Sequence, residues 1–212
     1  MFGGILSHES YVLLDGYHLT GVSSASISSN SSSSVMSPIG TEMGLTTVSG
    51  PTKQSLSLSR NLIYNDPILK KVGRGEAIQG QIHDLKQNSY YGFESGYINS
   101  YSVNCAVGTA PKVNTSLNVL DEIKSGYMES PRKRIHPKIQ TPSQKDITIT
   151  SDDFQGHRVV GFDYSINVDQ EVKYTIGSTS PSFIKEKKPI KYSASVQLEL
   201  GKTYNGQSFD FL

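Results

Sequence analysis

The residues of this chain that could carry out chemistry form no recognised catalytic pattern. His83 is followed by Asp84, which could orient it as a catalytic base, yet no nucleophile motif of the Gly-x-Ser-x-Gly kind accompanies the pair. The sequence has no phosphate-binding loop ending in Lys-Ser or Lys-Thr, and no Cys or His pairs at zinc-binding spacing. We expect each histidine to face solvent or to be satisfied locally, so the sequence predicts neither an enzyme nor a cofactor. The five histidines are His8, His18, His83, His136 and His157.

The charged clusters have a structural and a binding interpretation. Asp152 and Asp153 could begin a turn or bind calcium, but two adjacent carboxylates fall short of the roughly six oxygens that calcium takes. We therefore favour a turn. The basic clusters at residues 132–134 and 185–188 could bind phosphate groups, although loop charges of this kind usually face solvent.

The aromatic residues and the single cysteine also allow more than one interpretation. Four tyrosines in the middle of the chain could stack on a glycan, but cross-strand pairs or contacts between subunits are the commoner use. Cys105 cannot form an intrachain disulfide, and we expect a small buried apolar residue in a strand. This cysteine usage fits assembly in a reducing cytoplasm. The four tyrosines are Tyr90, Tyr91, Tyr97 and Tyr101.

The composition favours a β-sheet protein with a thin core. Of the 212 residues, 35% are hydrophobic, 18% are charged and 32 are serine. The formal net charge of +1 does not support a disordered chain, a nucleic-acid binder or a polybasic membrane protein. The apolar runs are too short for a membrane span, and the N-terminus lacks a secretory signal pattern. Apolar residues that alternate with Ser and Thr are typical of antiparallel strands with one face in water.

The first third of the chain predicts strands around a long extension. Residues 11–28 alternate well enough for one or two strands, with a turn at Asp15-Gly16. Residues 29–53 hold a serine run followed by Gly, Pro and Thr, so we expect a long loop or an extended hairpin arm. Strict alternation returns over residues 54–63, which supports an arm with two paired legs.

The middle of the chain holds the two places where we expect helix. Residues 66–85 can form a weak helix that glycines interrupt, and residues 121–127 can form one helical turn. Residues 88–96, which are rich in Tyr and Phe, are expected to be a turn. Residues 97–107 and 112–120 predict a short hairpin.

Residues 128–146 mark a break in composition. Prolines and a basic cluster favour an extended connection along the surface. We therefore divide the chain into a first β domain (1–127), this connection, and a second β segment (147–212). A loop rich in Ser and Lys is expected between Gly177 and Pro189. Further strands are expected at 147–150, 158–168, 172–177 and 190–200.

The sequence pattern of one strand pair occurs three times along the chain. The serines that mark the two strands lie 31, 14 and 30 residues apart in the three copies, which predicts a long, a short and a long hairpin. The distance of 139 residues from the first copy to the third suggests a complete unit followed by the first half of another. Serine-rich strands can also resemble one another by chance. The marker pairs are Ser26 and Ser57, Ser102 and Ser116, and Ser165 and Ser195.

The short hairpin resembles a known family. Residues 96–117 contain an aromatic Ser-Tyr-Ser-Val strand, a Val-Gly-x-x-Pro turn and a small polar strand. This stretch is similar to one found in tail tube proteins of tailed bacteriophages and their relatives in contractile injection systems, including tube-end and hub proteins of that type.

The resemblance implies an all-β fold with little helix, either an antiparallel β-sandwich or a rolled β-barrel with a long hairpin arm. It implies a virion protein of the tail, made in the host cytoplasm. Its partners would be further copies in a hexameric or pseudo-hexameric ring, neighbouring tail proteins, and genomic DNA that passes through without sequence recognition, with no membrane partner. The thin core and the need to cover exposed sheet edges favour assembly independently. The alternative is a β-sandwich binding module for a glycan or receptor at a tail tip or fibre.

Two groups of residues are candidates for assembly contacts. The first group lies on the arm, which would reach the adjacent ring, and comprises Ser31, Ser34, Met36, Pro38, Met43 and Leu45. The second group lies on the short hairpin, which would contact the neighbouring subunit, and comprises Tyr97, Tyr101, Val103, Val113 and Leu117.

Overall fold

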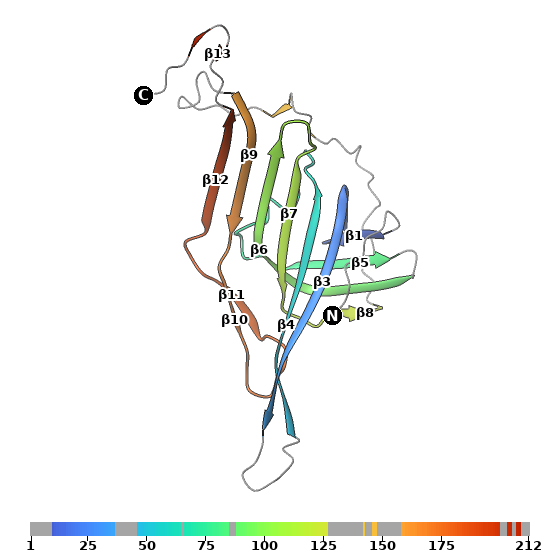
Figure 1. Ribbon diagram of the computed structural model, residues 1–212. Helices are drawn as coiled ribbons and strands as arrows, with labels where there is room; N and C mark the ends of the chain where they lie inside the picture. Colours follow the sequence, from blue (N-terminus) through green and yellow to red (C-terminus); the bar gives the residue numbers. More distant parts are fainter. Residues whose placement is uncertain are drawn as a thin grey trace.

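The protein, seen in a computed structural model, is built almost entirely from antiparallel β-strands (Figure 1). The structure describes residues 10–36, 46–64, 66–84, 88–126, 142, 146–147, 158–199, 203–204 and 207–208. Within these ranges there is no α-helix, and the main sheet does not close into a barrel. The predicted all-β fold is confirmed, and its antiparallel sandwich form is the one observed.

The strands follow one another along the chain in the order in which they are numbered. They are β1 (Ser10–Leu14), β2 (Tyr17–Leu19), β3 (Val22–Met36), β4 (Thr46–Asn61), β5 (Ile78–Asp84), β6 (Ser89–Ala106), β7 (Lys112–Val119), β8 (Lys124–Ser125), β9 (Arg158–Asn167), β10 (Gln170–Lys173), β11 (Phe183–Glu186), β12 (Lys191–Glu199), β13 (Thr203–Tyr204) and β14 (Gln207–Ser208).

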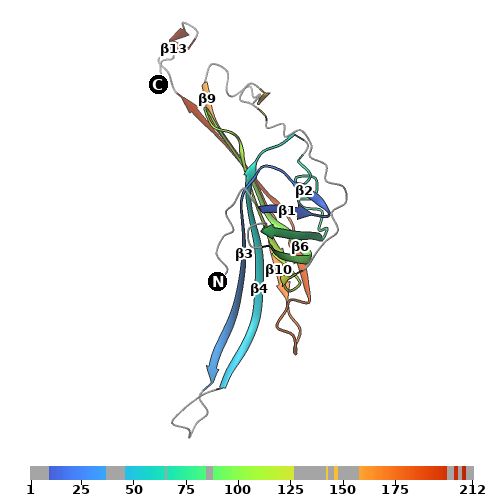
Figure 2. The same cartoon turned by 90° about the vertical axis from the view of Figure 1, so that its right-hand side faces the viewer.

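Strand β6 belongs to two layers that cross each other. Its first half pairs with β5 and β8, and its second half pairs with β7 and β9. The large layer therefore has the order β12-β9-β6-β7-β4-β3, and the small layer has the order β2-β1-β5-β6. The strands of the small layer run across those of the large layer and cover one of its sides (Figures 1 and 2).

The hydrophobic core fills the space between these layers. Leu56 and Leu117 on neighbouring strands of the large layer are fully buried, and Ile82 of the small layer is 1% exposed. Phe93 lies over two glycines, because a Cβ at Gly80 or Gly96 would come within 2.3 or 2.5 Å of its ring. The absence of side chains at those two glycines leaves room for the Phe93 ring within the β5–β6 strand pair.

The three repeated strand pairs all form, and all lie in the large layer. They are β3–β4, β6–β7 and β9–β12, each antiparallel. Ser26 lies directly opposite Ser57, whereas in the other two pairs the marker serines are offset by two residues and stay on the same face. The third pair continues the sheet, because β9 is hydrogen-bonded to β6. Most of residues 128–146 lie outside the described part, so the division of the chain at this point stays a prediction.

The expected arm and turn are confirmed, but the two expected helices are wrong. Asp15 and Gly16 both have positive φ and form the tight turn between β1 and β2. Residues 66–75 form a series of turns with positive φ at Gly73 and Gly75, and β5 follows them. Those glycines end any helix, and the alternation from Ile78 onward then favours a strand.

Besides the second expected helix, three further expectations about local structure are wrong. Residues 88–96 are the first half of β6 instead of a turn, because their aromatic side chains find partners across the strand pair with β5. Residues 121–127 contain β8 instead of a helical turn. The expected loop from Gly177 to Pro189 contains β11, and the strand expected at 172–177 is β10, which ends at Lys173. Of the strand expected at 147–150, residues 148–150 lie outside the description.

A buried ion pair lies inside the core and links the large layer to the turns that precede β5. Arg60 of β4 is fully buried and pairs with Asp66, whose side chain is 3% exposed. Asp66 also accepts a hydrogen bond of 2.6 Å from the Tyr101 hydroxyl and one of 2.9 Å from the backbone N–H of Ile68. One carboxylate thus connects β4, β6 and the turn at residues 66–70.

Replacing Asp66 with Asn should lower the free energy of unfolding by about 3–5 kcal/mol, because the Arg60 charge would stay buried without its counter-ion. The matched control is Asp169→Asn. Asp169 pairs with Lys191 on the surface, where their side chains are 51% and 65% exposed, so the loss should stay below about 1 kcal/mol. Urea unfolding monitored by tyrosine fluorescence measures both. Equal losses would contradict a structural role for the buried pair.

Burial, together with the hydrogen bond to Asp66, raises the pKa of Tyr101 far above its usual value. The stability that comes from keeping this phenol neutral is fully present below about pH 10, the pKa of an unfolded tyrosine, and decreases as the pH rises further. We expect Tyr101→Phe to be less stable than wild type at about pH 8, and the difference to shrink by about 1.4 kcal/mol per pH unit above pH 10. A constant difference in urea midpoints across this range would rule out the effect.

Candidate assembly surface

The side of the large layer that faces away from the core is lined with small hydroxyl and amide side chains, and we call it the serine face. Its members alternate with core residues along the strands, except on β12, where Tyr192 and Ala194 between them are exposed. Each member is at least partly exposed except Asn118. They are Ser24, Ser26 and Ser28 of β3; Ser55, Ser57 and Ser59 of β4; Asn114, Ser116 and Asn118 of β7; Ser100, Ser102 and Asn104 of β6; Asp163 and Ser165 of β9; and Ser193 and Ser195 of β12.

The serine face is ordered in rows that cross all six strands of the large layer. One row joins six directly paired residues from one edge to the other: Ser24, Ser59, Asn114, Ser102, Ser165 and Ser193. Hydroxyl pairs lie 2.7 Å apart near each edge, at Ser28–Ser55 and at Ser165–Ser193. A shallow hollow of about 180 Å³ lies among the serines of β3, β4 and β7. The repeat of the sequence therefore becomes a continuous polar surface.

The charge on the serine face is small. Lys112, Asp163 and Lys191 lie on it, and the Asp163 carboxylate accepts hydrogen bonds from Asn104 and, at 3.5 Å, from Ser195. A surface of hydroxyl and amide groups with so little charge has few groups that could hold a polyanion tightly.

The two edges of the large layer are its second candidate surface. Among the described strands, β3 pairs with β4, and β12 pairs with β9, so each presents one row of backbone groups outward. Strand β3 is 15 residues long and contains no charged residue and no proline. Charged side chains and proline are the usual devices that stop an edge strand from pairing, so β3 has the composition of a strand suited to pairing.

The arm, described over residues 30–36 and 46–53, extends the β3–β4 pair beyond the rest of the sheet, because β4 pairs with β7 no further than Gln54 (Figures 1 and 2). Its base touches the segment between β10 and β11: the Thr52 N–H donates to the Thr179 carbonyl at 2.8 Å, and the Tyr174 hydroxyl donates to the Thr52 carbonyl at 3.3 Å. We call the end of the molecule that carries the arm the arm end, and the opposite end, with the β6–β7 turn, the turn end.

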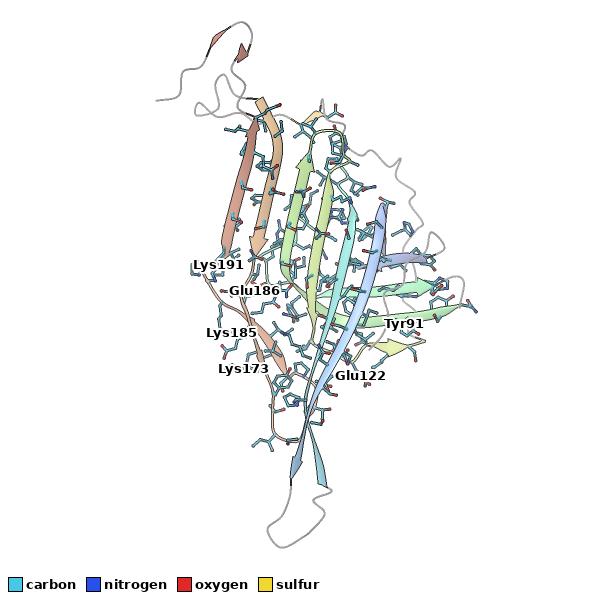
Figure 3. The ribbon with its side chains drawn as sticks, in the orientation of Figure 1. Tyr91, Glu122, Lys173, Lys185, Glu186 and Lys191 are labelled. Carbon is cyan, nitrogen blue, oxygen red and sulfur yellow. The ribbon has the colours of Figure 1, made fainter. Side chains whose placement is uncertain are left out.

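The basic cluster at residues 185–188 begins on β11 with Lys185 and continues just after that strand with Lys187 and Lys188. Lys173, Lys185 and Lys191 lie along the β12 side of the molecule (Figure 3). Lys173, Lys187 and Lys185 lower the pKa of Glu171, mainly through the hydrogen bond from Lys173. The cluster is solvated charge around an acidic residue, in agreement with the structural interpretation, and the cluster at residues 132–134 lies outside the described residues.

The arm candidates lie where the arm leaves the sheet or beyond the described residues. Ser31 and Ser34 are exposed on β3 in the arm, and Met36 is the last residue of that strand. Pro38, Met43 and Leu45 lie outside the described residues. Their role in contacts between rings stays a prediction.

The short-hairpin candidates divide into buried and surface residues. Tyr101, Val113 and Leu117 are fully buried in the core of their own chain, Val103 packs against that core, and Tyr97 is half-buried. The role of the five in contacts between subunits stays a prediction. In this conformation the three fully buried side chains have no surface to offer a partner.

The residues that could do chemistry do not converge on a site. His83 is buried, its ring stacks on Tyr90 at 3.8 Å between centroids, and it meets the edge of Tyr11 at 4.7 Å. Asp84 points to the opposite face of β5, because neighbouring residues on a strand alternate. Tyr90 and Tyr91 diverge in the same way, so the four tyrosines do not share one glycan-binding face. Cys105 is half-buried, and burial raises the pKa of its thiol.

The described part of the chain also lacks a metal-binding cluster and a membrane-spanning helix. No group of three or more His, Cys, Asp or Glu residues there could hold a metal ion. No helix in that part is long and apolar enough to cross a membrane. Sequence reasoning missed the β10–β11 hairpin and an apolar pocket beside the β6–β7 turn. The alternation of Val172 and Ile184 with charged residues was a signal for that hairpin.

No protein-family model matches this chain, and no curated protein matches it. Chains in three solved structures are similar in fold to part of this chain. The tail of an empty gene transfer agent particle with C6 symmetry aligns with 54% of this chain and 92% of its own, at 12% identity and a TM-score of 0.43. A chain from the virion of a native gene transfer agent particle aligns with 56% of this chain and 96% of its own, at 11% identity and a TM-score of 0.43. A chain from the six-fold symmetrised baseplate of the anti-feeding prophage aligns with 59% of this chain and 97% of its own, at 12% identity and a TM-score of 0.42. At these values the similarity describes part of the fold and no more.

Shortening the arm should leave the fold intact. Ser31 and Thr52 are directly paired, so replacing residues 32–51 with Asn-Gly closes the same two strands with a two-residue turn. We expect the free energy of unfolding to change by less than about 1 kcal/mol, because the removed residues are on a surface extension. Circular dichroism and urea unfolding measure this. A large loss would mean that the arm supports the core.

Proposed function

We propose that this chain is a structural subunit of a bacteriophage-type tail. Its copies would join edge to edge into a ring around a DNA channel, in the tail tube or at its end or hub. The tail assignment is supported by the resemblance of residues 96–117 to tube-type proteins. The observation that carries the ring is the pair of free edges on the large layer, β3 and β12, with β3 lacking charge and proline along 15 residues.

The strand directions favour a head-to-tail ring. The large layer has six strands, and every neighbouring pair is antiparallel, so β3 and β12 run in opposite directions. When β12 of one copy lies beside β3 of the next, the new pair is antiparallel too. The same contact can repeat around a closed ring, in which the backbone groups of both edges find partners.

The serine face is proposed to line the channel. The small layer covers the other face of the sheet, and a second layer fits more easily on the outer circumference of a ring than on the inner one. The channel wall would then consist of hydroxyl and amide groups with little charge. DNA could pass along such a wall without strong ion pairs and without base recognition.

The arm is proposed to contact the adjacent ring. It projects along the strand direction past the end of the sheet, as Figure 2 shows. A ring stacked at the arm end would therefore lie alongside it. The Asn-Gly variant described above, which keeps the fold, should then assemble into rings that stack poorly.

A proline scan of β3 and β12 tests edge pairing. Along an edge strand, backbone N–H groups point alternately toward the sheet and outward. Proline at inward positions should unfold the chain, whereas proline at the alternate, outward positions should keep the monomer folded and abolish rings. The positions are Ser24, Ala25, Ser26 and Ile27 on β3, and Ser193, Ala194, Ser195 and Val196 on β12. Negative-stain imaging and sedimentation measure assembly, and circular dichroism measures folding.

The central strand β7 provides the control for this scan. Both of its sides are paired within the chain, so proline at either of two adjacent positions, Thr115 or Ser116, should unfold it. If folded edge-proline variants still form rings, edge pairing is wrong. If the wild-type chain stays a monomer at high concentration and binds a glycan array, the binding-module alternative replaces the tail subunit.

A further inference from the structure

An isoleucine stands fully exposed at the tip of the β10–β11 hairpin. The side chain of Ile176 is 108% exposed, and Gly177 beside it has φ +92°. The tip is ordered by local hydrogen bonds, including Ser178 N–H to the Thr175 carbonyl at 3.2 Å and a hydroxyl pair between Thr175 and Ser182 at 2.9 Å. The hairpin therefore holds a branched apolar side chain in water on a defined support, an arrangement that contributes nothing to the core.

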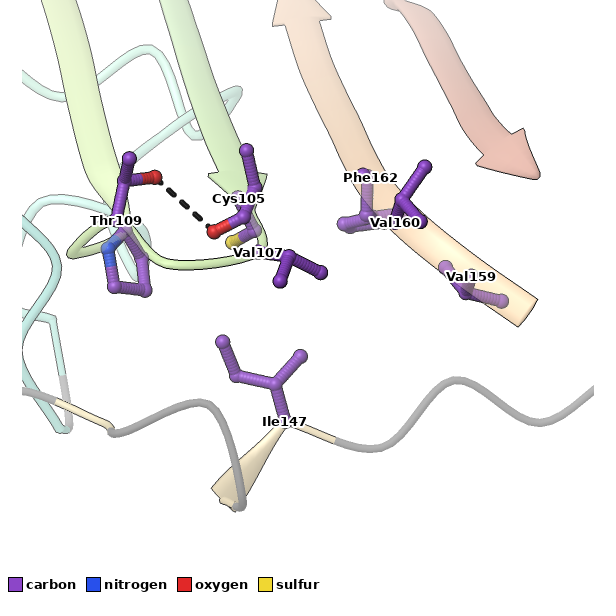
Figure 4. Close-up of a pocket in the computed structure, with 10 residues that line it drawn as sticks. Cys105, Val107, Thr109, Ile147, Val159, Val160 and Phe162 are labelled. Atoms are coloured by element: carbon purple, nitrogen blue, oxygen red, sulfur yellow. Dashed lines mark hydrogen bonds between the residues drawn. The ribbon is translucent and has the colours of Figure 1, made fainter. Parts of the chain in front are cut away.

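An apolar pocket of about 260 Å³ lies at the turn end of the molecule. It is formed by the β6–β7 turn, the start of β9 and Ile147, and Figure 4 shows Val107, Val159 and Ile147 around it. Val107 is 42% exposed, and its N–H donates to the Val160 carbonyl at 3.0 Å, which fixes the turn against β9. The pocket is open to solvent and of a size that suits a single side chain better than a drug-sized ligand.

The exposed side chain, on the separate β10–β11 sheet, and the pocket, at the edge of the large layer, lie at opposite ends of the molecule. The loop between β10 and β11 points toward the arm end, whereas the β6–β7 turn and the start of β9 form the turn end (Figures 1 and 2). We propose that the Ile176 tip of one copy inserts into the apolar pocket of a second copy stacked along the strand direction. This inference rests on the proposed function and specifies the contact between successive rings.

The second copy fits this pocket for two reasons. The Ile176 tip at one end and the apolar pocket at the other make a head-to-tail contact. Such a contact can repeat from copy to copy along one axis, as a tube requires. The arm projects in the same direction as the tip, so one stacking movement brings both against the neighbouring copy. Burying one isoleucine in each of several contacts per ring gives cooperative stacking from weak individual contacts.

The single cysteine of the sequence provides a direct probe, because Cys105 lines the pocket. In the Ile176→Cys variant each copy carries one thiol at each end. An added oxidant such as copper phenanthroline removes two electrons and two protons from the two thiols of a contact, which forms one disulfide between copies. We expect a ladder of dimers, trimers and longer multimers on a non-reducing gel. Because burial raises the pKa of the Cys105 thiol, oxidation is best run at about pH 9.

Two control variants show whether the cross-link is specific. Ile176→Cys combined with Cys105→Ser has one thiol per copy and should give no multimers beyond dimers. Tyr192→Cys, at a position that is 62% exposed on β12, keeps Cys105 but should give no ladder, because β12 lies at the ring contact. A ladder with Tyr192→Cys, or none with Ile176→Cys under conditions where wild type stacks, would overturn the inference.

Charge substitutions test the energetics of the same contact. Ile176→Asp should weaken stacking by about 10- to 100-fold, the loss expected for one buried isoleucine, while rings still form. Val107→Asp in the pocket should have the same effect. The matched control is Leu69→Asp, which places the same charge on an exposed apolar residue (43% exposed) of the turns that precede β5, and it should stack normally.

The outcomes separate this inference from the proposed function. Normal stacking by Ile176→Asp, or wild-type rings that never stack, would overturn the inference and leave the ring subunit standing. A wild-type chain that forms no rings at all would overturn both. Rings that require a different protein to fill the pocket would also overturn it, because the occupant would then not be a second copy.

Discussion

The fold depends on one strand that serves two layers at once. Strand β6 is hydrogen-bonded to β5 and β8 in its first half and to β7 and β9 in its second, so the remaining strands of the main sheet attach to it directly or through a neighbour. Gly96 marks the place where it passes between the layers, because this residue is paired both with Ile78 of β5 and with Val119 of β7. Gly80 and Gly96 leave room there for the ring of Phe93. Without this crossing, the core face of the large layer would lie open to water.

The large layer has two faces of opposite character, and the alternation of serine with apolar residues is the cause. The apolar positions meet the small layer and include a fully buried ion pair, Arg60 with Asp66, that is tolerated because Tyr101 and a backbone amide add hydrogen bonds to the carboxylate. The hydroxyl positions form rows across six strands. The two faces and the two edges of this layer are the features on which the proposal of a ring rests.

Local periodicity accounts for what could be predicted. The three serine-marked strand pairs, the turn at Asp15-Gly16 and the arm all form, because each depends on residues close in sequence or on a period of two. The expected helix at 66–85 failed because Gly73 and Gly75 adopt positive φ and end it, so that β5 follows. The expected turn at 88–96 failed because one of its glycines, Gly96, makes room for the ring of Phe93 from within a strand. The candidate residues of the short hairpin show what alternation cannot predict. Alternation places Tyr101 and Leu117 on one face of the sheet, but it does not indicate that the small layer covers that face.

The sequence by itself determined the strand pairs, the polarity of each strand face and the presence of the arm. These are short-range properties, set by a side-chain period of two and by turn residues. Only the tertiary structure decided that the three pairs join into one sheet, that β6 crosses between layers, and that Ile176 and the apolar pocket lie at opposite ends. Those arrangements depend on which strands pair across long separations in sequence, and many pairings satisfy the same local pattern, so the choice is made by packing of the whole core.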